Sequence, residues 1–224
     1  MTPSSLAPDI TPERLRHIRW IGGGSGAGKS TIAGLLAAEY GLRLYHCDDS
    51  QPVHTARSNA ADYPMLHAFM AMTMDERWVT RTPEEMFRTF HGFHGEGFRL
   101  ILEDLLDLPT DMPVLVEGYK LLPRQVFPLL SHVDQAVWLI PTPEWRRAAF
   151  SQRGSLWTIA GRTSDSHTAL ANLLARDALY TEELTRQAAA LNLSTIEVNG
   201  SLVVDELAER AAGCLGLGPG KSKP

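Results

Sequence analysis

The sequence predicts an α/β fold with a five-stranded parallel sheet that helices cover on both faces. Short β-type runs alternate along the chain with segments whose apolar residues recur at helical spacing. This alternation is typical of βαβ units, in which crossover helices pack on the sheet. A glycine-rich stretch also joins the first β-type run to the first helical segment. A chain of 224 residues fits one domain more naturally than two, so we expect a single domain over 1–224.

Each expected element follows from its own residues. The β-type runs are HIRWIG from His17, LRLYHC from Leu42, PVLVEG from Pro113, QAVWLI from Gln135 and STIEVN from Ser194. Apolar residues at helical spacing predict helices over 30–40, 121–130, 168–191 and 203–215. Gly41 is expected to cap the first of these helices.

Residues 50–112 interrupt the alternation, because they contain no convincing strand. They predict a helical insertion whose longest helix, over 84–108, is broken by the glycines of HGFHGEGF. Open α/β folds bind ligands at the carboxyl ends of their strands, so an insertion over that edge would contact a substrate. The Gly/Pro/Lys-rich tail, about 216–224, is expected to be flexible.

Composition and charge favour a small-molecule partner. The chain is 44% hydrophobic and 21% charged, as in ordinary globular proteins, and its net charge is −5 without a dense Lys/Arg run. We therefore expect no nucleic-acid or membrane partner, and a monomer or a homodimer. No apolar run approaches transmembrane length and the N-terminus lacks a signal-peptide core, which favours a cytoplasmic location. Cys47 and Cys214 lack metal-like spacing and are expected to be free thiols, with Cys47 buried.

The stretch WIGGGSGAGKST carries the strongest motif. Gly23, four further residues and Gly28-Lys29-Ser30 match the P-loop pattern G-x-x-x-x-G-K-[ST], between a β-type run and a helix as that motif requires. Bare glycines let backbone N–H groups converge on phosphate oxygens at a helix N-terminus. We expect nucleotide phosphates to bind Gly23, Gly24, Ser25, Gly26, Ala27, Gly28, Lys29, Ser30 and Thr31. Lys29 would reach the β and γ phosphates, and Ser30 would hold Mg²⁺. The alternative is a flexible glycine loop with an unrelated lysine.

The other motifs narrow the class of nucleotide-binding protein. GTPases carry D-x-x-G and N-K-x-D, transport ATPases an LSGGQ-like signature, and AAA+ motors an Asp-Glu pair after the third core strand, and none of these occurs here. Instead, Asp48 and Asp49 end the second β-type run and Glu117 ends the third. Carboxylates at that edge can accept a proton from an attacking hydroxyl or hold a Mg²⁺ shell. The alternatives are a turn-forming Asp pair and a simple strand terminator.

The sequence resembles the uridine kinase and nicotinamide riboside kinase branch of P-loop kinases. The resemblance rests on GGGSGAGKST, HCDDSQP, VLVEGYKLL, WLIPTPEWRR and EVNGSLVVDEL, and it does not extend to residues 53–112. It implies a P-loop NTPase three-layer sandwich with strand order 2-3-1-4-5, and ATP and Mg²⁺ as cofactors. It also implies that Asp48 is the catalytic base and that Glu117, with Ser30 and Asp48, serves the metal. Asp49 is expected beside the substrate.

A second resemblance covers residues 161–180. The segments GRTSD and ARDALY are similar to the lid and following helix of nucleoside monophosphate kinases, in which arginines close on the phosphates. We expect a lid over about 150–165. The candidate arginines are Arg153 for the nucleotide, Arg162 for catalysis, Arg176, and Arg147 after them. Exposed helical arginines are common, so each could equally be a bystander.

The insertion is expected to select the substrate. Its segment MTMDERWVTRTPEEMF offers Arg77, Trp78 and Arg81, which could stack on or hydrogen-bond an acceptor. The alternative is a helix end with ordinary surface charges. His91 and His94 have ligand-like spacing but no evident third ligand, which argues against a metal site.

Together these patterns predict an ATP-dependent kinase that moves the γ-phosphoryl group to a hydroxyl of a small molecule. A nucleoside, a riboside or a natural-product alcohol would be such an acceptor. Two alternatives remain open: a nucleoside monophosphate kinase, and a P-loop nucleotide-binding regulatory protein with weak ATPase activity.

Overall fold

Five parallel strands form one sheet in the order β2-β3-β1-β4-β5. The computed structural model describes residues 10–153 and 155–218, with the backbone alone for 152, 153 and 155–157. The strands are β1 (Ile18–Gly23), β2 (Arg43–His46), β3 (Val114–Glu117), β4 (Ala136–Pro141) and β5 (Ser194–Val198). All five predicted β-type runs are therefore strands.

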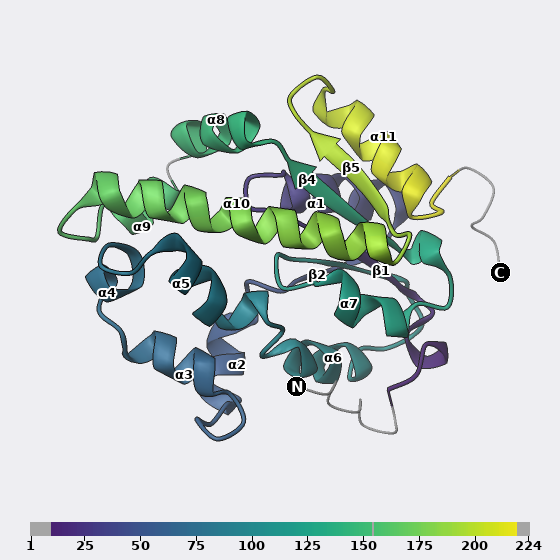
Figure 1. Cartoon of the computed structure of the whole chain (residues 1–224). Coiled ribbons are helices and arrows are strands. Elements are labelled where there is room, and N and C mark those ends of the chain that lie inside the picture. The colour runs from purple at the N-terminus through teal and green to yellow at the C-terminus, as the bar shows by residue number, and fades with distance from the viewer. Residues whose placement is uncertain (1–9, 154, 219–224) are drawn as a thin grey trace.

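Helices cover both faces of the sheet, because successive strand residues point to opposite sides. Trp20 and Trp138 are fully buried on one face with residues of α6 (Phe98–Leu106), α7 (Pro123–Val126) and α10 (Ser166–Ala190). Ile21 and Val137 point to the other face, which α1 (Lys29–Tyr40) and α11 (Val204–Cys214) cover. Truncating either tryptophan to alanine would cost about 3–5 kcal/mol. Figure 1 shows α10 lying along the sheet.

Strand register brings the ends of the strands to one edge. Ile21 in β1 pairs with Glu117 in β3, and Glu117 pairs with His46 in β2. On the other side, Gly23 in β1 pairs with Leu139 in β4. The glycine-rich loop (residues 23–30) and the turn after His46 therefore leave the sheet at the same edge.

Three of the predicted helices are confirmed, and a fourth is shorter than expected. α1, α10 and α11 match the predicted segments, and Gly41 caps α1 in the left-handed conformation, with φ 64°. Over 121–130, however, only Pro123–Val126 is α-helical, followed by a 3-10 turn over Phe127–Leu129. Pro128 explains the break, because it has no N–H group for an α-helical hydrogen bond.

The described segment between β2 and β3 is helical, as predicted, but it consists of an insertion and a last helix, α6, that covers the sheet. The elements are α2 (Gln51–Arg57), α3 (Pro64–Ala71), α4 (Met74–Trp78), α5 (Pro83–Thr89), a 3-10 turn (His91–Phe93) and α6. The predicted helix over 84–108 divides into α5 and α6 around Gly95 and Gly97, which both have positive φ. Ile101 and Leu105 of α6 pack on the sheet, so α6 belongs to the covering layer and the insertion ends before it.

The insertion packs against the predicted lid. Figure 1 shows α4 and α5 beside α9 (Ser155–Ala160) and the first half of α10. Trp78 and Met86 form a small hydrophobic core there with Ala160 and Leu173. A hydrogen bond of 2.8 Å from Ser164 N to Asp75 Oδ1 also joins the turn after α9 to α4. At the C-terminus, residues 216–218 still follow α11, and 219–224 of the predicted tail lie outside the described residues. No described helix is long and apolar enough to cross a membrane.

Candidate functional site

The glycine-rich loop packs on α10 on one side and is open on the other. A Cβ added to Gly24 would lie 2.8 Å from Thr181 Oγ1 and 2.8 Å from Pro141 Cδ, so only glycine fits there. Gly28 has φ 80°, and a Cβ added to it would meet nothing within 4 Å. Gly28 is also the N-cap of α1, where N–H groups without helical partners can bind an anion.

Lys29 lies against the loop that precedes it. Its Nζ donates a hydrogen bond to the carbonyl oxygen of Gly24 at 3.0 Å. Burial lowers the pKa of Lys29, and the carboxylates of Glu117, Asp48 and Asp177 oppose that shift. Lys29 thus lies at the open loop with three carboxylates in electrostatic reach.

Glu117 joins the loop to the neighbouring strand ends. Its Oε1 accepts from Ser30 Oγ at 3.0 Å and contacts His46 Nδ1 at 2.7 Å, while Glu117 itself is only 4% exposed. A carboxylate beside a hydroxyl suits Mg²⁺, which prefers oxygen ligands. Among the described residues no three His, Cys, Asp or Glu side chains form a metal site, so Mg²⁺ here would need further oxygens from phosphate and water.

Asp48 and Asp49 lie directly after β2, both exposed to solvent. Surrounding protein raises the pKa of Asp48 through desolvation, whereas Lys29 and Lys120 lower it. Lys120 is buried, and its Nζ donates to Gln51 Oε1 at the start of α2. Asp48 therefore lies within electrostatic reach of Lys29 at the glycine-rich loop, and its role as a base stays a prediction.

A buried charged cluster, Arg146, Arg176 and Asp177, lies on α8 (Pro143–Arg153) and α10 beside the glycine-rich loop. Arg176 Nε and Nη2 donate to Asp177 Oδ1 at 2.9 and 2.6 Å, and Arg146 Nη2 donates to Thr181 Oγ1, the atom next to Gly24. Burial lowers the pKa of Arg146, against the attraction of Asp177. Arg146 Nε, Arg176 Nη1 and Asp177 Oδ2 are buried without a hydrogen-bond partner among the described residues. Buried charged atoms without a protein partner are rare, and a bound water, an ion or a catalytic role can account for them.

Arg176 also contacts the insertion. Its Cζ lies 5.0 Å from the Trp78 ring centroid, 4.9 Å from that of Phe90 and 5.0 Å from that of Phe93. Three aromatic rings around a guanidinium group hold it by cation–π attraction. Trp78 is 7% exposed, so in this structure it packs on Arg176 and leaves little surface for a substrate.

Arg77 and Arg81 close the ends of two helices. Arg77 donates to the carbonyl oxygens of Phe69 and Met70 at 3.1 and 2.9 Å, at the end of α3. Arg81 donates to the carbonyl oxygens of Glu76 and Arg77 at 2.8 and 3.2 Å, at the end of α4. Cations favour helix C-termini, so these contacts agree with the helix-end alternative, and substrate binding by the pair stays a prediction.

The lid arginines differ in their positions. Arg147 and Arg162 are exposed, and the side chain of Arg153 lies outside the described residues. Arg146, which the sequence reasoning missed, is the buried arginine of α8. Helical spacing could have identified it, because Arg146, Ala149 and Phe150 share the buried face of α8.

A pocket adjoins the glycine-rich loop. Trp145 Nε1 donates to the Gly26 carbonyl oxygen at 3.2 Å and forms one wall. The pocket is lined by Gly26, Ala27, Gly28, Thr31, Ile32, Trp145, Glu197, Val198, Asn199, Gly200, Leu202, Val204 and Leu207. Its lining combines apolar side chains with a few polar groups.

The two cysteines and the histidines His91 and His94 show no sign of a metal site among the described residues. Cys47 is fully buried and Cys214 is half-buried, and both are free thiols, as expected. Burial lowers the pKa of His91 to about 4, helped by Lys120 and Arg176, so His91 is neutral at pH 7. His94 is exposed, and its Nε2 lies 3.0 Å from the Phe87 carbonyl oxygen.

Comparison with known proteins adds little. No protein-family model matches the chain, and no curated protein matches it. Among solved structures, it is similar to the crystal structure of an uncharacterized protein from Eubacterium ventriosum ATCC 27560, at 13% sequence identity and a TM-score of 0.40. That match covers 89% of this chain and 98% of the other. A likeness this slight carries no functional inference.

Proposed function

We propose that the chain is an ATP-dependent phosphotransferase of the P-loop kinase type, which transfers the γ-phosphoryl group of ATP to a hydroxyl of a small molecule. One observation carries the proposal: Lys29 and the Ser30–Glu117 pair lie at the open glycine-rich loop, with Asp48 within electrostatic reach. A nucleotide loop, a metal-compatible pair and a general base are the parts such a reaction needs. The strand order β2-β3-β1-β4-β5 agrees with the order that the resemblance implies.

The residues present fit ATP and Mg²⁺. The open side of the loop at Gly28 offers room and N–H donors for phosphates, and Ser30 and Glu117 offer oxygens for the ion. The pocket beside Trp145 would hold the base. The unpartnered N–H groups of Arg146 and Arg176 suit an anion. When bound, ATP supplies the phosphoryl group and Mg²⁺ neutralises phosphate charge.

The chain itself would activate and position the acceptor. Asp48 would accept the proton of the acceptor hydroxyl, and its raised pKa makes it a stronger base than an ordinary aspartate. Lys29 would neutralise charge that develops on the phosphates. Arg176, fixed between Asp177 and the aromatic rings, would bring positive charge to the acceptor side without much loss of side-chain entropy.

Charge balance favours a neutral acceptor over a monophosphate. The buried and loop cations Lys29, Lys120, Arg146 and Arg176 face three carboxylates, Asp48, Glu117 and Asp177. A nucleotide already brings negative charge to this nearly balanced cluster, and a monophosphate would add about two more negative charges. Arg77 and Arg81, the other candidates for a phosphate clamp, have their guanidinium groups on helix-end carbonyls. We therefore favour an alcohol acceptor and keep the nucleoside monophosphate kinase as the alternative.

Acceptor-stimulated ADP release tests the proposal. ADP formation is measured with ATP and Mg²⁺ alone, and then with matched panels of nucleosides, ribosides and aminoglycoside-like alcohols and of nucleoside monophosphates. We expect stimulation by at least one alcohol in the native chain and none in Lys29→Met. Stimulation by monophosphates alone would favour the alternative kinase, and slow, acceptor-independent hydrolysis would favour a regulatory nucleotide-binding protein.

A further inference from the structure

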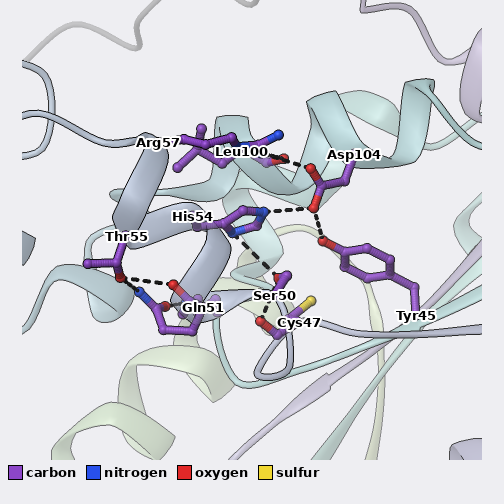
Figure 2. A network of polar contacts seen from close by, with 10 residues as sticks. Tyr45, Cys47, Ser50, Gln51, His54, Thr55, Arg57, Leu100 and Asp104 are labelled. Carbon is purple, nitrogen blue, oxygen red and sulfur yellow. Dashed lines mark hydrogen bonds and ion pairs between the residues drawn. The ribbon is translucent and has the colours of Figure 1, made fainter.

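Asp104 of α6 contacts two other elements, β2 and α2, through its two carboxylate oxygens. Oδ2 accepts from Tyr45 Oη at 2.6 Å and contacts His54 Nε2 at 2.7 Å, and Oδ1 accepts from Arg57 Nη2 at 2.8 Å. Figure 2 shows Tyr45, His54 and Arg57 converging on this one carboxylate. Tyr45 belongs to β2, and His54 and Arg57 belong to α2.

These contacts enclose the turn that carries Asp48. Tyr45 precedes Asp48 by three residues, and His54 follows it by six. Inside the turn, Ser50 Oγ donates to the Cys47 carbonyl oxygen at 3.0 Å and lies 3.5 Å from His54 Nδ1. Asp104 thus holds both ends of the segment 45–57.

The contact between His54 and Asp104 is protected from water, whereas the Arg57 contact is exposed. The side chains of His54 and Asp104 are 3% and 22% exposed. Burial alone would raise the pKa of Asp104, but the hydrogen bonds from Tyr45, His54 and Arg57 outweigh it and the pKa is lowered. Asp104 is therefore an ionised acceptor, and charge-assisted hydrogen bonds of this kind are stronger than neutral ones.

The group does not form a hydrolytic triad, although Ser50, His54 and Asp104 have the right residue types. Ser50 donates its hydroxyl hydrogen to the Cys47 carbonyl oxygen, and its contact with His54 Nδ1 is long, at 3.5 Å. His54 is only 2% exposed, which leaves no room for a substrate. A positioning role explains the geometry better.

We propose that Asp104 is a positioning residue, which holds the turn that carries Asp48 against the edge of the sheet. Asp104 also holds the start of α2, where Gln51 accepts the hydrogen bond from Lys120. The expected effect on catalysis rests on the proposed kinase function, whereas the holding of the turn does not depend on it. A general base displaced by about 1 Å can lose roughly a hundredfold in rate. Asp104 touches neither Lys29 nor the glycine-rich loop in the described contacts, so nucleotide binding should be spared.

The test compares Asp104→Asn with Glu103→Gln, a neighbouring exposed acid on the same helix that pairs only with Arg99 in the described contacts. Amide hydrogen exchange is followed over 45–57 and over α1 in each full-length variant. With ATP and a stimulating acceptor, kcat and the KM for ATP are measured as well. We expect Asp104→Asn to lose protection over 45–57 but not over α1, and to lower kcat about ten- to a hundredfold with KM for ATP within about threefold.

Unchanged amide exchange over 45–57 in Asp104→Asn would overturn the proposal. An equal loss of protection over α1 in that variant, or over 45–57 in Glu103→Gln, would overturn it as well. If Asp104→Asn does not fold, Tyr45→Phe gives the same comparison, because it removes the 2.6 Å hydrogen bond to Asp104 together with the contact of the Tyr45 hydroxyl with Ser50. Absence of kinase activity in the native chain would refute the proposed function, and the exchange result would still decide whether Asp104 holds the turn.

Discussion

Alanine at three glycines should have three different effects, because the structure gives each glycine a different environment. At Gly24, a Cβ would lie 2.8 Å from Thr181 Oγ1 and from Pro141 Cδ. Backbone or side chains must therefore shift, and overpacking of this kind costs about 1–3 kcal/mol. Thr181 is also the partner of Arg146, so the shift should disturb the buried charged cluster and lower turnover.

Gly28 and Gly34 provide the comparison. At Gly28 there is space, but the left-handed φ of 80° costs alanine about 1–2 kcal/mol, and the added methyl group would occupy the open side of the loop. We expect Gly28→Ala to weaken ATP binding more than folding. Gly34 lies within α1 with nothing near its Cβ position, so Gly34→Ala should stabilise the protein by about 0.5–1 kcal/mol.

Urea unfolding, thermal melts and ATP turnover measure these effects. For a chain of this size, 1 kcal/mol corresponds to a Tm change of about 2–4 °C. We expect a lower Tm for Gly24→Ala and Gly28→Ala and a higher Tm for Gly34→Ala. A Gly24→Ala protein as stable and active as the native chain, or a Gly34→Ala protein destabilised like Gly28→Ala, would refute the packing described for the loop.

Three further predictions concern single side chains. Lys29→Met should abolish phosphoryl transfer and leave the thermal melt nearly unchanged, and near-native turnover in the folded variant would remove the P-loop assignment. Asp48→Asn should lower turnover by roughly 10² or more with a smaller change in ATP affinity, and Asp49→Asn should do less; the reverse order would place the base at Asp49. His91 stays neutral in the fold until pH about 4 but takes up a proton below pH about 6.5 when unfolded, so it should remove about 3 kcal/mol of stability as the pH falls between these values. His91→Gln should flatten that part of the stability profile measured by urea unfolding, and an unchanged slope in His91→Gln would contradict the buried neutral state.

The fold could be predicted because its signals are local and strong. The five strands are short apolar runs, and Gly41 ends α1 where a left-handed residue is required. Motif spacing also placed Lys29 and Ser30 at the start of a helix, and the strand ends brought Glu117 to Ser30. Residues 84–108 were harder, because only packing shows that α6 covers the sheet while α5 belongs to the insertion.

The helical spacing of α8 could have identified Arg146, but the hydrogen-bond partners of the site depend on contacts between distant segments, which the sequence does not reveal. Arg146 and Arg147 are neighbours of equal type, and only the direction of the α8 face buries one of them. Arg77 and Arg81 appeared suited to a substrate, but the ends of α3 and α4 supply carbonyl oxygens that accept their hydrogen bonds. His46 and Lys120 were missed because their partners, Glu117 and Gln51, lie about 70 residues away.

The most direct test of the central claim follows the γ-phosphoryl group itself. The native chain and Lys29→Met are incubated with γ-labelled ATP, Mg²⁺ and the alcohol that most stimulates ADP release, and the products are separated by mass. We predict that the label appears on the alcohol, one phosphoryl group for each ADP formed, with the native chain and not with Lys29→Met. Label found only in inorganic phosphate, or transferred equally by both proteins, would contradict the assignment of this chain as a small-molecule kinase.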